Sequence, residues 1–125
     1  MQDPSLNIIE KAWDGKGWYN GNLNFACPIV RANLAVVSWV NGPARIRVYY
    51  NAPGDTVLEK GYDGNGWYQG DFNQKSVPAS NIAAITLNNT PNLRVYLQNG
   101  VDNTAVSEFA WVGHWTPGQT ALPPA

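Results

Sequence analysis

A short motif recurs three times along the chain at nearly constant spacing. Each copy begins with a glutamate, continues through an aromatic residue and a glycine-containing turn, and ends with a tryptophan. The glutamates are Glu10, Glu59 and Glu108, and successive members are 49 residues apart. A period of this size is typical of proteins built from stacked or radially arranged units, in which no unit buries its apolar face alone. The repeat therefore favours a modular fold over a single irregular core.

The composition limits the partners that the chain can have. Of 125 residues, 12% are aromatic and six are tryptophan, whereas 14% are charged and the formal net charge is −1. Such a surface does not favour the phosphate backbone of a nucleic acid. No apolar run reaches the roughly 20 residues that cross a bilayer. We therefore expect neither nucleic-acid binding nor membrane insertion.

The few reactive residues limit the chemistry further. Cys27 is the only cysteine, so no intrachain disulfide is expected. One histidine and one cysteine provide no metal cluster and no pair of nucleophile and base. We expect no metal and no cofactor. The chain opens on polar residues and not on a signal peptide, which leaves its location open between the cytoplasm and the cell surface.

Short runs of β-branched and aromatic residues, separated by glycine, proline and asparagine about every 8 to 12 residues, predict an all-β fold. The first full unit spans residues 33–80, with strands expected at 34–39, 45–50, 56–62 and 66–71. The second spans residues 81–125, with strands expected at 82–87, 92–98, 105–111 and a short one near residue 115. Residues 6–32 contain only the last two strands of the unit.

Four antiparallel strands in about 45 residues correspond to one blade of a β-propeller. The chain therefore encodes about two and a half blades, which cannot close a ring. Open ends would expose strand edges and the apolar faces that blades bury against one another. Either several copies associate, as a dimer or trimer that completes the ring, or the chain is a piece of a longer protein. We favour association.

Each full unit also contains an arginine. Arg47 and Arg94 stand in the expected second strands, on the face opposite their apolar neighbours. The second and third strands form a hairpin, so Arg47 is expected near Glu59 and Arg94 near Glu108. A guanidinium and a carboxylate together bind neighbouring hydroxyl groups. A flat aromatic ring binds the apolar face of a sugar.

Each of these residues also has a structural explanation. Tryptophans in a β-repeat are usually core residues, and an arginine beside a glutamate is usually an ion pair. A core does not, however, require the same charged pair and the same two rings in successive units. Their recurrence favours a binding site for a small hydroxylated ring with one apolar patch.

Four motifs support a family resemblance. They are Trp-Asp-Gly-Lys-Gly-Trp-Tyr-Asn-Gly from residue 13, Ile-Arg-Val-Tyr-Tyr from residue 46, Leu-Glu-Lys-Gly-Tyr-Asp-Gly-Asn-Gly-Trp-Tyr-Gln-Gly from residue 58 and Ile-Ala-Ala-Ile-Thr from residue 82. Together they resemble the six-bladed fucose-binding propeller lectins, which include fungal Aleuria-type proteins and two-blade bacterial relatives that trimerise. The resemblance implies a non-catalytic lectin that binds L-fucose and fucosylated glycans at several equivalent sites without calcium.

In that family each site lies between adjacent blades, with an arginine and a glutamate from one blade and two aromatic residues from the next. The resemblance implies three sets of sugar-binding residues here. The set within one chain is Arg47, Glu59, Trp111 and Trp115. The set shared with a neighbouring copy is Arg94, Glu108, Trp13 and Trp18. The set without an arginine is Glu10, Tyr62 and Trp67. The turn before Trp115 is one residue shorter than its counterparts, which leaves the position of that indole open.

Two other functions are compatible with a propeller. A glycoside hydrolase needs two carboxylates roughly 5–10 Å apart, whereas the three motif glutamates belong to different blades. Asp14 and Asp63 each precede a glycine, and tight-turn chemistry explains them. A protein-interaction propeller would use its rim or channel, but a peptide ligand would not require the same four groups in every blade.

Overall fold

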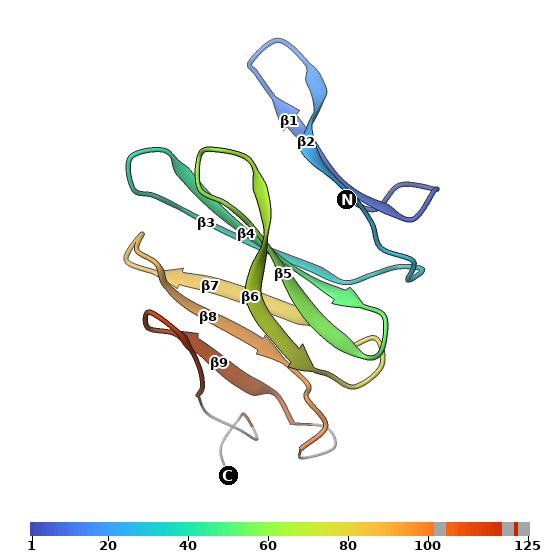
Figure 1. Ribbon diagram of the computed structural model, residues 1–125, viewed down its shortest axis with the longest axis vertical. Helices are drawn as coiled ribbons and strands as arrows, with labels where there is room; N and C mark the ends of the chain where they lie inside the picture. Colours follow the sequence, from blue (N-terminus) through green and yellow to red (C-terminus); the bar gives the residue numbers. More distant parts are fainter. Residues whose placement is uncertain (102–104, 119–121, 123–125) are drawn as a thin grey trace.

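The computed structural model describes residues 1–101, 105–118 and 122, and within them ten strands form three antiparallel sheets (Figure 1). The first sheet consists of β1 (Asn7–Trp13) and β2 (Trp18–Ala26). The second consists of β3 (Leu34–Val40), β4 (Ala44–Ala52), β5 (Thr56–Tyr62) and β6 (Trp67–Lys75). The third consists of β7 (Ile82–Leu87), β8 (Asn92–Leu97), β9 (Ser107–Trp111) and β10 (Trp115–Pro117). The predicted all-β class is confirmed.

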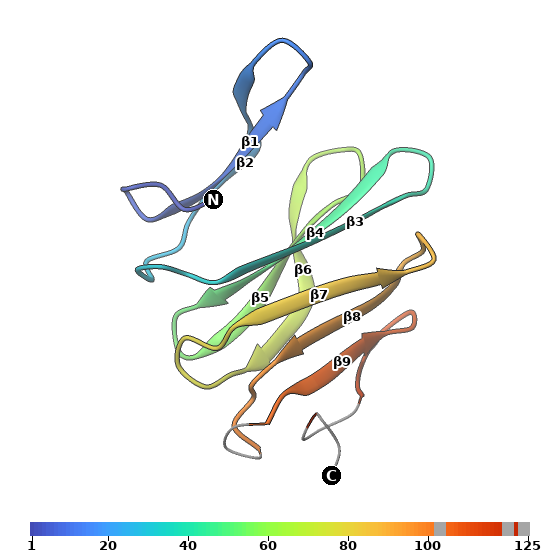
Figure 2. The same cartoon turned by 180° about the vertical axis from the view of Figure 1, so that it is seen from behind.

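The three sheets lie in a row, with β1 and β2 at one end and β7 to β10 at the other (Figures 1 and 2). In both four-stranded sheets each strand pairs with the next one in the chain. This sequential antiparallel order is that of a propeller blade. The two-stranded sheet corresponds to the outer half of a blade, so the chain is a partial propeller. Among the residues described, no helix has the length and apolarity that crossing a membrane requires.

The hairpin between β4 and β5 sets the register that positions the candidate site. Gly54 and Asp55 both adopt positive φ, 82° and 52° respectively. Glycine adopts such angles without steric cost, and aspartate tolerates them better than most residues. The resulting register places Tyr49 opposite Glu59 and Arg47 opposite Gly61.

The second and third sheets bury one hydrophobic core between them. Side chains alternate along each strand, and Tyr49, Val57, Phe72 and Val95 are completely buried there. Phe72 lies at the centre of this core, with its ring 4.7 Å from the Trp115 ring in an edge-to-face arrangement. This contact ties the second sheet to β10, the last strand of the third sheet.

The opposite face of the second sheet packs against the half-blade. Ile8 and Leu23 of the half-blade contact Val48 and Tyr50 in a second buried cluster. Phe25 extends this contact, with its ring 4.7 Å from the Tyr50 ring. The second sheet is therefore covered on both of its faces.

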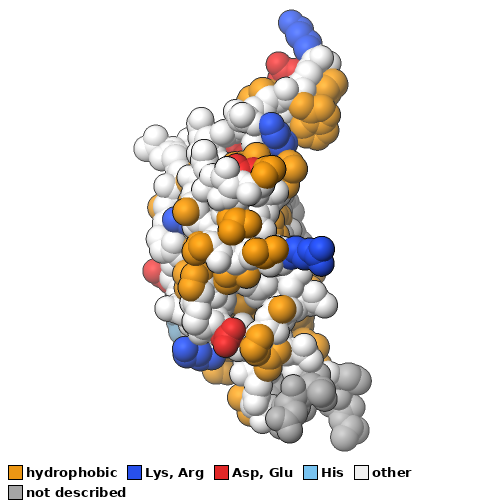
Figure 3. All heavy atoms as spheres, turned by 90° about the vertical axis from the view of Figure 1, so that its right-hand side faces the viewer, with side chains coloured by type: hydrophobic (Ala, Val, Ile, Leu, Met, Phe, Trp, Pro, Cys, Tyr) orange, Lys and Arg blue, Asp and Glu red, His pale blue; other side chains and the backbone are white. Residues whose placement is uncertain are grey.

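The half-blade leaves large rings exposed. Trp13 and Trp18 lie 5.6 Å apart and are 55% and 71% exposed. Figure 3 shows hydrophobic side chains at this end of the molecule and again along the middle of the same face. On the edge of β1 that faces away from β2, Met1 forms two backbone hydrogen bonds with Ile9. In a closed propeller such edges and faces are buried by further strands and blades.

Strand β6 extends to Lys75, four residues beyond the predicted end at residue 71. The register shifts between Leu58 and Lys60, so that residues 70–72 lie opposite Glu59 alone. After this bulge β6 pairs with β5 again. Its second half is polar apart from Phe72, which is why the alternation of apolar residues did not reveal it.

Candidate functional site

A pocket of about 150 Å³ lies between the second and third sheets. It is lined by all four residues expected in the within-chain set, namely Arg47, Glu59, Trp111 and Trp115. The other lining residues come from both sheets and were not in that set: Trp39, Tyr68, Gly70, Asp71, Pro91 and Leu93. The fold thus gathers the charged pair of one blade and the indole pair of the next around one cavity.

Glu59 is buried in the wall of this pocket. Glu59 is only 4% exposed, and its Oε2 atom has no hydrogen-bond partner among the residues that the structure describes. A buried carboxylate oxygen without a partner is costly in a folded protein, since its desolvation is not compensated. The Tyr49 hydroxyl on the opposing strand is likewise buried without a partner among the described residues, so Oε2 can accept a hydrogen bond from Tyr49 or from a group outside the chain.

A glycine makes room for this carboxylate. A Cβ atom added at Gly70 would lie 1.9 Å from Oε1 of Glu59, far inside any real contact. The other two motif glutamates have the same arrangement: the corresponding distances are 2.1 Å from Gly21 to Glu10 and 2.3 Å from Gly118 to Glu108. The sequence prediction missed these glycines. Their signal is a glycine ten or eleven residues after each motif glutamate.

Arg47 forms its ion pair with Asp63, which was predicted to be a turn residue only. The Arg47 Nη1 atom lies 2.9 Å from the Asp63 carboxylate. Because Arg47 faces Gly61, it sits two residues beyond Glu59 toward the end of β5, where Asp63 follows. The guanidinium also lies over the Trp39 and Tyr68 rings, at 5.0 and 5.5 Å from their centres. The interpretation of Asp63 as a turn residue alone is therefore wrong.

A tyrosine stands directly opposite each glutamate of the two full blades. Tyr49 faces Glu59, and Tyr96 faces Glu108 with its hydroxyl donating to Oε2 at 2.8 Å. Burial raises the pKa of Glu59 above its usual range, although the nearby Tyr49 hydroxyl and the Arg47 charge oppose the shift. Burial and the Glu59 charge together raise the pKa of Tyr49, which keeps its hydroxyl neutral.

The indole pair of this pocket has nearly the same ring separation as the other two aromatic pairs. Trp111 and Trp115 lie 5.6 Å apart with their planes at 60°. Tyr62 and Trp67 lie 5.4 Å apart. The shorter turn does not displace Trp115, because it still pairs with Trp111 across the hairpin.

The structure does not bring the second predicted set together within one chain. Arg94 donates to Asn92 and to the Leu93 carbonyl, and it forms no ion pair with Glu108 within the described structure. Trp13 and Trp18 belong to the half-blade at the opposite end of the molecule (Figure 1). A single copy of the chain thus supplies only half of this set at either end.

The third predicted set does come together. Glu10, Tyr62 and Trp67 line a pocket of about 240 Å³ between the half-blade and the second sheet. Its other lining residues are Ala12, Tyr19, Asn20, Gly21, Asn22 and Ile46, so no arginine is among the described residues around it. This pocket therefore has the carboxylate and the rings but not the guanidinium.

Residues 1–125 match the family model of the fungal fucose-specific lectins. The chain is 37% identical over 114 residues to the fucose-specific lectin of Aleuria aurantia, a match that covers 90% of this chain and 34% of that protein. Across the four curated relatives that match, the chain spans 34% to 43% of their length.

Solved structures give the same result. The SapL1 lectin in complex with alpha methyl fucoside superposes with a TM-score of 0.90 at 46% identity, over 99% of this chain and 42% of that one. A structure of the Aleuria aurantia lectin, which has a six-bladed β-propeller fold, superposes with a TM-score of 0.56 at 24% identity, over 94% of this chain and 55% of that one. The predicted propeller fold is confirmed.

Proposed function

Since the chain belongs to the fungal fucose-specific lectin family, we propose that it binds L-fucose and fucosylated glycans in the pocket between its second and third sheets. The observation that supports this most directly is the buried Glu59 carboxylate, whose unpartnered Oε2 borders a pocket that Arg47 and two indoles also line. A sugar hydroxyl would provide the missing donor.

The pocket offers a complementary group for each part of a deoxy sugar. Glu59 accepts hydrogen bonds from hydroxyl groups, and Arg47 donates to their oxygens. The Trp111 and Trp115 rings contact the apolar edge, including the methyl group. A single site of this size engages few atoms and binds weakly, so a ring with several sites gains its affinity for glycan surfaces by avidity.

Calorimetric titration with methyl α-L-fucoside tests this function. We expect saturable binding, together with glycan-array binding that free L-fucose competes away. L-galactose is a matched control ligand, because a hydroxymethyl group replaces the methyl group that contacts the indoles. The absence of binding to any fucoside by the folded chain would refute the assignment.

We also propose that the site is not catalytic. The three motif glutamates belong to separate sheets, so no two of them line the same pocket of the described structure. Asp71 also lines the Glu59 pocket, so the test has to cover this pair. Prolonged incubation with a fucosylated oligosaccharide should leave the ligand intact. Release of free fucose would support the hydrolase alternative instead.

Binding at this pocket should weaken on acidification. Glu59 must be ionised to accept two hydroxyl donors, and its pKa is raised by burial. The affinity for methyl α-L-fucoside should therefore begin to fall at a higher pH than for an exposed glutamate. Titrations between pH 7 and pH 4 measure this, with Glu59→Gln as a control whose weaker binding stays constant. Affinity that is constant over this range in the unmodified chain would contradict a role for the Glu59 charge.

We further propose that residues 6–32, 33–80 and 81–125 act as a half-blade and two blades of a ring that is completed from outside this chain. If copies of the chain complete it, Trp13 and Trp18 of one copy cover Arg94 and Glu108 of the next. The exposure of both indoles supports this arrangement. Light scattering should then give a dimer or trimer, and Trp18→Ala and Arg94→Ala should remove the same fraction of fucoside sites. A 13.7 kDa monomer with one site would contradict association of copies.

A further inference from the structure

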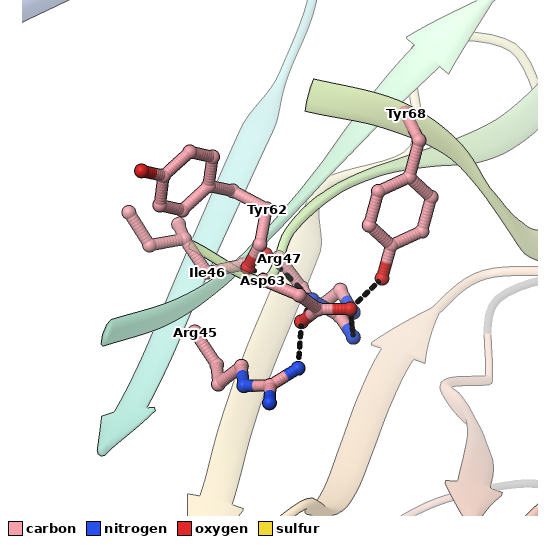
Figure 4. A network of polar contacts seen from close by, with 6 residues as sticks. All are labelled: Arg45, Ile46, Arg47, Tyr62, Asp63 and Tyr68. Carbon is pink, nitrogen blue, oxygen red and sulfur yellow. Dashed lines mark hydrogen bonds and ion pairs between the residues drawn. The ribbon is translucent and has the colours of Figure 1, made fainter. Parts of the chain in front are cut away.

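Asp63 is the centre of a polar network at the edge of the pocket (Figure 4). Its Oδ1 atom accepts from Nη1 of Arg47 at 2.9 Å and lies 3.2 Å from Nη1 of Arg45. Its Oδ2 atom accepts from the Tyr68 hydroxyl at 2.5 Å and from Nη2 of Arg47 at 3.4 Å. One carboxylate thus binds two arginines and a tyrosine, and Arg47 and Tyr68 both line the pocket.

The network uses one side of the Arg47 guanidinium and leaves the other side available. Its Nη1 atom donates to Asp63 and to the carbonyls of Ile46 and Tyr62. The guanidinium has five N–H donors, and within the described structure Nε donates to no acceptor. The guanidinium carbon also lies over the Trp39 and Tyr68 rings, and these contacts restrict the movement of the group. The orientation of the free donors therefore depends on the groups around the guanidinium. Among these groups, Asp63 accepts hydrogen bonds from both Nη atoms of Arg47 and from the Tyr68 hydroxyl.

The other two copies of the motif do not form this polar network. The residue equivalent to Asp63 is Asp14 in the half-blade, where it accepts from the backbone N–H groups of Lys16 and Gly17 in its own turn. In the third sheet the equivalent residue is Val112, and Arg94 donates to Asn92 of its own strand instead. An aspartate at this position is thus not required to form the turn, and only in the second sheet does it hold an arginine.

We propose that Asp63 is a positioning residue that orients Arg47 for ligand binding, and that it makes the Arg47 pocket the tightest site of the chain. This proposal rests on the proposed function. The physical basis is preorganisation: a guanidinium held by several acceptors and two rings loses less conformational entropy on binding than a free arginine side chain. The same network lowers the pKa of Asp63, because the bonds from Tyr68 and the two arginines outweigh the effect of burial, which would raise it. Asp63 therefore stays ionised at neutral pH.

A double-mutant cycle tests whether Asp63 acts through Arg47. Titration with methyl α-L-fucoside would compare Asp63→Asn, Arg47→Lys and the double variant with the unmodified chain. We expect Asp63→Asn to weaken binding about tenfold alone, but less than about twofold in the Arg47→Lys background, where the forked guanidinium is absent. Asp14→Asn is the matched control and should bind as the unmodified chain does. Equal losses in both backgrounds, or no loss from Asp63→Asn, would overturn the proposal.

A second measurement does not depend on sugar binding. In ¹H–¹⁵N spectra recorded without ligand, the signal of the Arg47 Nη1 hydrogens, which donate to Asp63, should be resolved and exchange slowly with water in the unmodified chain and in Asp14→Asn. It should broaden or disappear in Asp63→Asn while the backbone spectrum stays folded. An unchanged Arg47 signal would refute the positioning role. If the signal responds as expected but no variant binds fucoside, the orientation of Arg47 is supported and the proposed lectin function fails.

Discussion

Replacing Arg47 with alanine should reduce the affinity of the within-chain pocket for methyl α-L-fucoside by about 100-fold or more. The substitution removes the cation that donates to the sugar oxygens, and hydrogen bonds to a charged group contribute about 1.5–3 kcal/mol each. Loss of two such bonds accounts for an effect of this size. Calorimetric titration of the variant measures it.

The fold should survive this change. Arg47 is paired with Asp63 at the pocket edge, and Asp63 keeps its second partner, Arg45. We expect the free energy of unfolding to fall by less than about 2 kcal/mol. Arg31, an exposed arginine outside the pocket, is the matched control, and Arg31→Ala should leave the affinity unchanged. If Arg47→Ala unfolds the chain instead, the arginine is a structural ion-pair residue.

Replacing Gly70 with alanine should damage the same pocket from the opposite strand. The new methyl group would lie 1.9 Å from Oε1 of Glu59 and 2.6 Å from its Cδ atom. Because these atoms belong to a side chain, Glu59 can rotate away, but it then leaves the position that faces the ligand. We expect fucoside affinity to fall by about as much as in Glu59→Ala, with a loss of about 1–3 kcal/mol in stability from overpacking. Titration and thermal unfolding of the variant measure the two effects.

Gly17 provides the matched control for this substitution. A Cβ atom added there would have nothing within 4 Å. Gly17→Ala should therefore leave both binding and stability nearly unchanged. A Gly70→Ala variant with unaltered affinity would show that the Glu59 carboxylate is not held in one position, and the role assigned to the glycine would be wrong.

The fold class and the blade architecture could be predicted from the sequence, because they depend on patterns that repeat. Strand alternation and turn residues placed β5 and β7 at the residues observed. The bulge opposite Glu59 could not be predicted in this way. A shift of register has no signal in the apolar pattern, since Asp71 and the residues after Phe72 are polar.

The candidate site, like the fold, could be predicted only in part from the sequence. The residues that repeat from unit to unit, such as Glu59 and Trp111, were found by their spacing and meet at one pocket. Asp63, Trp39 and Tyr68 were not assigned a role in binding, because the third sheet has residues of other types at the equivalent positions. Their contribution depends on the direction in which the Arg47 side chain extends, which three-dimensional packing determines.

Because the second sheet is covered on both faces, its strands should unfold locally less often than the rest of the molecule. Amide protons in a sheet enclosed by two neighbours exchange with solvent only through the largest cooperative opening, whereas an edge element exchanges through smaller local fluctuations. The strands that carry Arg47 and Glu59 should thus form the slowest-exchanging unit, and β1 and β2 should release their protons first. The molecule can then lose its terminal hairpin transiently while the geometry of the pocket persists.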